Sequence, residues 1–157
     1  MPESTVPTLY EWAGGMSAFE RLTEIFYQKV LADPLLQPLF QHMLPEHAHY
    51  VAQFLAEVFG GPPSYSAERG GHAHMVSEHL NRHLTQPQRE QFVRLLQAAA
   101  DDAGLPTDPE FRSAFAAYLE WGSRIAVLNS EPGAKPADPS TPMPHWGWGE
   151  VGGPYRG

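Results

Sequence analysis

Four of the eight histidines in this 157-residue chain fall within a stretch of twelve residues, directly after the glycine pair Gly70-Gly71. They are His72, His74, His79 and His83. Imidazole can bind a metal, relay a proton or donate a hydrogen bond near neutral pH. We weigh three interpretations of the cluster: surface histidines on a loop and one short helix, a hydrolytic metal site, and a single axial ligand of a haem iron.

A hydrolytic site would use His79 and His83, which are four residues apart and would share one face of a helix. A zinc peptidase helix also needs a glutamate directly after its first histidine, whereas Leu80 follows His79. A di-iron bundle needs inward carboxylates at similar spacing on several helices, and the sequence lacks that pattern. A haem ligand needs only one histidine, with apolar helix faces forming a dry slot for the macrocycle.

The composition narrows the classes of protein further. The chain has no cysteine, which excludes a disulfide scaffold, an iron–sulfur cluster and a thiolate zinc site. Ten Lys and Arg against 18 Asp and Glu give a net charge of -8, and the basic residues are scattered, so we expect no nucleic-acid partner. We also expect no membrane partner and a cytoplasmic protein, because the sequence shows neither a long apolar run nor a signal peptide.

The elements that must position these residues have the periodicity of amphipathic helices, which predicts an all-α fold. Thr8 caps a short first helix that stops at Gly14-Gly15, and a Ser17-x-x-Glu20 capping box is expected to open the second. Later helices are predicted from about Pro45 to Gly60-Gly61, from Gln86 to about Ala103, and from Asp108-Pro109 to Asn129.

These predicted helices each carry an apolar stripe. The stripes are Phe19, Leu22, Phe26 and Val30; Val51, Phe54, Leu55 and Val58, headed by His47; Phe92, Leu95, Leu96 and Ala99; and Phe111, Phe115, Tyr118 and Ile125. Residues 131–157 are rich in proline and glycine and are predicted to be irregular, yet they contain Trp146, Trp148 and Tyr155. We expect this tail to wrap the domain or to form a subunit contact, which leaves a homodimer open.

Between about Leu9 and Asn129 the order of several short motifs resembles the truncated haemoglobins, and most of all their second subgroup. The motifs are Gly14-Gly15, Phe26-Tyr27, Phe40, Phe54-Leu55, Gly60-Gly61-Pro62, Tyr65-Ser66, Arg69-Gly70 and His79. Members of that subgroup carry a phrase of the form FGGPxxYxxxxGH ahead of the proximal histidine. The resemblance implies a two-over-two helical sandwich around haem b in residues 1–130, followed by the tail, residues 131–157.

The resemblance also implies roles for individual residues. The proximal iron ligand falls on His79, with His74 and His83 as the nearest rivals. Tyr65 and Arg69 match positions near the haem propionates, although on a loop they could equally be surface residues. The other positions implied to line the cofactor are Phe40, Val51, Phe54, Leu55 and Met75.

On the distal side, Tyr27 matches the tyrosine whose hydroxyl points at the bound ligand. His47 falls where the next helix first crosses the haem, and it either faces the pocket or points to water like His42 and His49. Phe92 stands where the subgroup typically has a tryptophan, and phenylalanine has no hydrogen-bond donor. Trp121 is a further candidate for packing beside the haem.

The function that follows from the resemblance is the binding of oxygen and other diatomic ligands at histidine-ligated iron. Oxygen transport, redox detoxification, nitric-oxide dioxygenation and peroxidase-like chemistry all start from that state. An enzymatic role would need a separate reductase, because the chain has no strand–GxGxxG–helix unit of the kind that binds flavin or nicotinamide. The alternative from another class is a haem-free all-α interaction module, whose histidines and aromatic tail contact a protein partner.

Overall fold

The computed structural model describes residues 6–154, and within that span the chain forms helices and no strand, as predicted. The helices are α1 (Leu9–Ala13), α2 (Met16–Leu31), α3 (Gln37–Phe40), α4 (His47–Val58), α5 (Ser64–Arg69), α6 (Gly71–His79), α7 (Gln86–Asp102), α8 (Pro109–Asn129) and the 3-10 turn η1 (Gly149–Val151). None of the helices among these residues is both long and apolar enough to cross a membrane.

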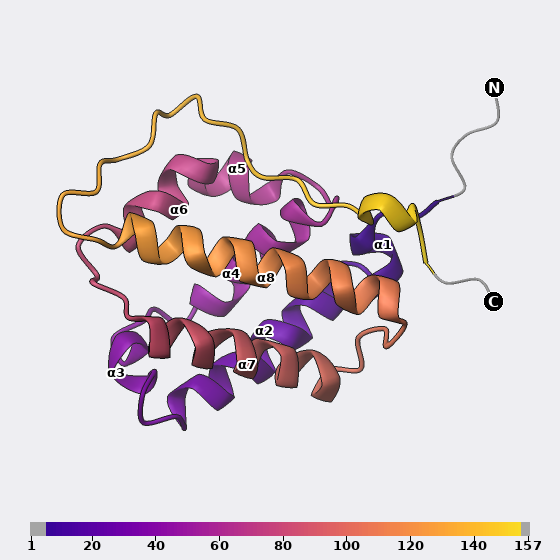
Figure 1. Cartoon of the computed structure of the whole chain (residues 1–157), viewed down its shortest axis with the longest axis horizontal. Helices are drawn as coiled ribbons and strands as arrows, with labels where there is room; N and C mark the ends of the chain where they lie inside the picture. Colours follow the sequence, from indigo (N-terminus) through magenta and orange to yellow (C-terminus); the bar gives the residue numbers. More distant parts are fainter. Residues whose placement is uncertain (1–5, 155–157) are drawn as a thin grey trace.

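The long helices form two packed pairs. Helix α2 contacts both α4 and α7, and α7 contacts α8, so α2 and α4 form one layer and α7 and α8 the other. Figure 1 shows α7 and α8 side by side in front, with α2 and α4 behind them. Helices α5 and α6 complete the domain, because α5 lies against α4 and α6 against α8. Phe19, Leu22 and Phe26 are fully buried between the layers.

The first two helices meet at the glycine pair. The Thr8 hydroxyl accepts a hydrogen bond from the Glu11 amide at 3.0 Å, and the Glu11 carboxylate accepts one from the Thr8 amide, which is the predicted capping box. The prediction that Ser17 caps α2 is wrong. Helix α2 begins at Met16, because Gly15 adopts a φ of 81° and its carbonyl already accepts from the Ala18 amide at 3.1 Å.

The histidine-rich segment forms helix α6, which ends at His79. Leu80 is extended, with a ψ of 133°, and His83 has a φ of 54°, in the left-handed region that non-glycine residues rarely adopt. The His83 amide donates to the Ser130 carbonyl at 3.0 Å, so this connector is anchored to the end of α8. His79 and His83 therefore do not share a helical face.

The tail crosses the molecule from the end of α8, over α5 and α6, to α1 (Figure 1). The Trp146 amide donates to the Val58 carbonyl at 2.8 Å, and the Trp148 indole donates to the Pro7 carbonyl at 2.7 Å. The tail thus wraps the domain. It is not wholly irregular, since η1 forms one turn within it, and Tyr155 lies outside the described residues. Ile125, which was predicted to be buried, is only half-buried.

The close approach of α1 to the end of α4 requires a glycine at position 61. A Cβ atom added to Gly61 would lie 2.7 Å from the Tyr10 ring and 2.8 Å from the Ala56 carbonyl oxygen. The Tyr10 amide is itself held by the Phe59 carbonyl at 2.8 Å, so the ring has little freedom to move away. A methyl group at position 61 would therefore meet a packed ring on one side and backbone on the other.

We predict that Gly61→Ala lowers the free energy of unfolding by about 1–3 kcal/mol, the usual cost of overpacking a core site. The measurement is urea denaturation followed by circular dichroism. Gly147→Ala is the matched control, because a Cβ atom there would meet nothing within 4 Å. Equal stabilities for the two variants would show that α1 can shift away from α4.

Candidate functional site

The imidazole of His79 has one nitrogen engaged and one free. Its Nδ1 atom lies 2.8 Å from the Met75 carbonyl, which can only accept, so Nδ1 carries the hydrogen and Nε2 keeps its lone pair. Burial lowers the pKa of His79, while the hydrogen bond to Met75 opposes this shift. A neutral imidazole with a fixed tautomer is the form that binds a metal.

A second polar pair lies between α2 and α4. The Tyr27 hydroxyl is 3.0 Å from His47 Nε2, and the two rings meet edge to face at 5.0 Å. Tyr27 is only 4% exposed, and burial raises the pKa of its phenol above the ordinary value. His47 therefore points inward at Tyr27, whereas His42 and His49 are exposed.

The electrostatic surroundings of His47 include residues of α6 and of the segment after it. The pKa of His47 is lowered, first by burial and then by the positive charges of Arg82 and His79, against the opposing charge of Glu78. The structure therefore gathers Tyr27, His47 and His79 in one region, from three different helices.

Aromatic rings surround the Tyr27–His47 pair. Phe40 lies 5.5 Å from Tyr27 and 6.0 Å from His47, between ring centroids. Phe92 contacts Phe26 edge to face at 4.9 Å, and Phe26 contacts Tyr27 at the same distance, so Phe92 is one ring removed from the phenol.

The remaining apolar candidates differ in how deeply their side chains are buried. On α4, Phe54 and Leu55 are buried and Val51 is half-buried. Trp121 does not join them, because its ring packs on Tyr118 at 6.0 Å and on Trp146 of the tail at 5.7 Å.

Tyr65 and Arg69 lie on helix α5 and not on a loop, because the residues between Pro63 and the left-handed Gly70 close one and a half turns of helix. Tyr65 is 2% exposed and meets Phe54 edge to face at 5.1 Å. The Arg69 guanidinium stacks over Tyr50 at 4.0 Å and donates to His74 Nε2 at 3.4 Å. Its Nε is buried without a partner, which leaves one donor available.

Two buried polar residues of α4 were missed by the sequence analysis. Glu57 is 4% exposed, and its carboxylate accepts hydrogen bonds from the Ser66 amide, at 2.9 Å, and from the Ser66 hydroxyl. Gln53 is 6% exposed and donates to the Glu68 carboxylate at 2.9 Å. Both bonds attach α5, and with it Tyr65 and Arg69, to α4. Their only signal in the sequence is a polar residue inside a strongly apolar helix.

The arrangement suits a metal whose other ligands come with a cofactor. Among residues 6–154 no three His, Cys, Asp or Glu side chains gather as a metal site. The chemistry of the site fits haem: a neutral histidine with a free Nε2, a wall of aromatic rings, and a guanidinium with an unsatisfied donor that suits a carboxylate.

Comparisons with known proteins agree with this geometry. The chain matches the bacterial-like globin family over residues 8–119. Group 2 truncated haemoglobin YjbI of Bacillus subtilis is 32% identical over 117 residues, which is 74% of this chain and 86% of that protein. The solved haemoglobin of Chloroflexus aurantiacus superposes with a TM-score of 0.68 at 34% identity, covering 76% of this chain and 97% of that one. The group II truncated haemoglobin of Bacillus anthracis gives 0.72 at 30% identity, covering 83% and 98%.

The chain belongs to the bacterial-like globins, and within them to the truncated haemoglobins of the second group, whose solved members share its two-over-two helical sandwich. Membership implies a haem cofactor with iron and the binding of oxygen and other diatomic ligands. It argues against the alternative of a haem-free interaction module.

The buried tyrosines predict a loss of stability at alkaline pH. Burial is the first cause that raises the pKa of Tyr27, Tyr65 and Tyr118, so the folded state keeps these phenols protonated while the unfolded state ionises near pH 10. Above that pH the unfolded state binds fewer protons, so each tyrosine lowers the free energy of unfolding by about 1.4 kcal/mol per pH unit.

We therefore expect Tyr27→Phe to make the decline between pH 10 and 11 shallower by about that amount, measured by urea denaturation at a series of pH values. An unchanged slope would mean that the Tyr27 phenol ionises in the folded protein as readily as in the unfolded chain.

Proposed function

We propose that the chain holds haem b through His79 and binds oxygen and other diatomic ligands reversibly beside Tyr27 and His47. The observation that carries this proposal is the His79 hydrogen bond to Met75, which leaves Nε2 free within the region that contains the Tyr27–His47 pair. When bound, the haem supplies an iron centre with an open coordination position for a diatomic ligand. The protein supplies the imidazole, the dry surroundings and the hydrogen-bond donors.

The surroundings of the two rival histidines favour His79 as the ligand. His83 is exposed, and its backbone is anchored to Ser130. His74 lies 3.3 Å from Glu78 and accepts from Arg69, so its Nε2 is already engaged. His79 is partly buried, its tautomer is fixed by a backbone hydrogen bond, and its Nε2 has no protein partner.

We expect His79→Ala to abolish stable haem retention and His83→Ala to leave it unchanged, because only the coordinating imidazole adds a bond to the iron. The measurement is the Soret absorbance remaining after gel filtration, with circular dichroism to confirm that both variants fold. Free imidazole should partly restore the spectrum of the His79 variant. If the His83 variant loses haem and the His79 variant keeps it, the proximal ligand lies in the connector after α6.

The tautomer of His47 decides what the Tyr27 hydroxyl can do. If His47 carries its hydrogen on Nε2, it donates to the phenol oxygen and leaves the phenol hydrogen free to donate elsewhere. With the hydrogen on Nδ1, His47 instead accepts from the phenol and consumes that donor. We propose the first arrangement, in which His47 orients Tyr27 and the phenol donates to the partially negative diatomic ligand. Phe92 cannot contribute a donor here.

On this basis Tyr27→Phe should leave haem binding intact and speed oxygen dissociation. Removing a hydrogen bond to a charged acceptor costs roughly 1.5–3 kcal/mol, which corresponds to about a tenfold to hundredfold faster release. Stopped-flow displacement by carbon monoxide measures the rate. His47→Leu should raise it less, because the phenol remains but loses its orienting partner. An unchanged rate in the Tyr27 variant would place its hydroxyl away from the ligand.

The other candidate residues would complete the haem site. Tyr65 and Arg69 are proposed to bind the propionates, supported by the unsatisfied Nε of Arg69. The apolar wall is proposed to consist of Phe40, Val51, Phe54, Leu55, Met75 and Phe92. Residues 1–130 would then form the haem domain and residues 131–157 an extension of it.

Reversible oxygen binding in this site would serve transport or, with an electron supply, redox detoxification. Each turnover of the second kind would need electrons from outside the chain, so a separate reductase is the partner that we propose for it.

A further inference from the structure

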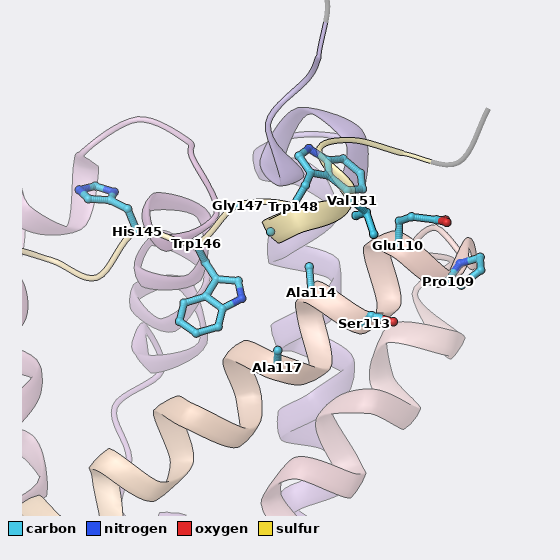
Figure 2. A pocket seen from close by; sticks show the side chains of 11 residues that line it. Pro109, Glu110, Ser113, Ala114, Ala117, His145, Trp146, Gly147, Trp148 and Val151 are labelled. Atoms are coloured by element: carbon cyan, nitrogen blue, oxygen red, sulfur yellow. The ribbon is translucent and has the colours of Figure 1, made fainter.

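A groove of about 460 Å³ lies along the first half of α8, and the proposed function does not use the residues that line it. Its floor is the first half of α8, with the small residues Ser113, Ala114 and Ala117, and its wall is the tail. Figure 2 shows these three residues along α8, with Trp146 and Trp148 projecting from the tail beside them. The surface is therefore apolar and lined by small side chains on one side.

The exposed face of α8 continues beyond this groove. Ser113, Ala117, Trp121 and Arg124 are all exposed and follow one another at helical spacing. Trp121 is 40% exposed, so its indole adds apolar surface to this face. One helix thus presents a hollow at positions 113 and 117 and a large apolar side chain one turn later.

This face is complementary to itself. If two copies of α8 pack antiparallel with the two-fold axis at Ala117, each position lies opposite the position equally far on the other side of 117. Ser113 then faces the partner's Trp121, and Ala117 faces the partner's Ala117. The large ring of each copy enters the hollow of the other, and the small residues at the centre allow the helices to approach closely.

The charged residues near the two ends of this face obey the same two-fold symmetry. Glu110 lies opposite the partner's Arg124 in this arrangement. Arg124 binds Glu120 through its Nε, which leaves its terminal guanidinium nitrogens available. The pairing would place opposite charges together at both ends of the interface.

We infer that this face of α8, together with the tail groove, is the interface of a homodimer in which Trp121 of each subunit inserts beside Ser113 of the other. The inference is independent of the proposed haem ligation, because no residue of the Tyr27–His47–His79 region takes part. The occupant of the groove is a second copy of this chain.

Cysteine cross-linking tests the two-fold axis directly, because the natural chain contains no cysteine. In the haem-loaded protein, Ala117→Cys places a thiol on the axis, opposite its own copy, and a mild thiol oxidant should convert it rapidly to a covalent dimer. Arg94→Cys, on the exposed face of α7, is the matched control and should cross-link slowly. Equal slow rates for the two variants would overturn the proposed axis.

Sedimentation velocity over a concentration series tests the contacts. The wild-type protein should associate to a dimer, and Trp121→Ala should raise the dimer dissociation constant at least about tenfold. Leu35→Ala, at a residue 42% exposed elsewhere on the surface, should leave it unchanged. A wild-type protein that stays monomeric at every concentration overturns the inference, whatever else the groove binds.

A charge exchange separates a lost contact from a damaged fold. Glu110→Arg and Arg124→Glu should each weaken the dimer, because each places like charges opposite one another twice. The double variant Glu110→Arg/Arg124→Glu restores opposite charges across the axis and should recover dimerisation. Failure of the double variant to recover, with its helical content intact, would show that the two positions do not meet.

Discussion

In the proposed function, the hydrogen bond from His79 to the Met75 carbonyl is the interaction on which the chemistry of this protein depends. It decides which imidazole nitrogen keeps its lone pair, and it holds the ring against the last turn of α6. Without that bond the ring could rotate or bind a metal through either nitrogen.

The packing of α2 against α4 fixes the positions of the other two polar residues of the site, Tyr27 and His47. The buried Tyr27 phenol has one side-chain partner, His47, and each residue is held on a different long helix. The α2–α4 contact that buries Phe19 and Phe26 therefore also sets the distance between the two polar groups. Packed helices can in this way bring together single residues from three elements, here Tyr27 of α2, His47 of α4 and His79 of α6.

Local signals in the sequence predicted most of the architecture. The Thr8 capping box, the glycine stops and the apolar stripes each depend on neighbours within a few residues, so they can be recognised without coordinates. The Ser17 box failed because Gly15 was available to start the helix earlier. The end of α6 at His79 could not be predicted, since the left-handed His83 is held by Ser130, a residue 47 positions away along the printed sequence. The buried Glu57 and Gln53 were missed for the same reason, as their partners lie on α5.

The tail contacts also fix an order of assembly. The bond between the Trp148 indole and the Pro7 carbonyl joins residues 141 positions apart, and closing so long a loop is among the most costly steps in loop entropy that this chain faces. The surfaces that receive the tail are built from α1, α4 and α8, so they exist only after the helical domain has formed. The domain can therefore fold around its cofactor first, and the tail then closes over a finished surface.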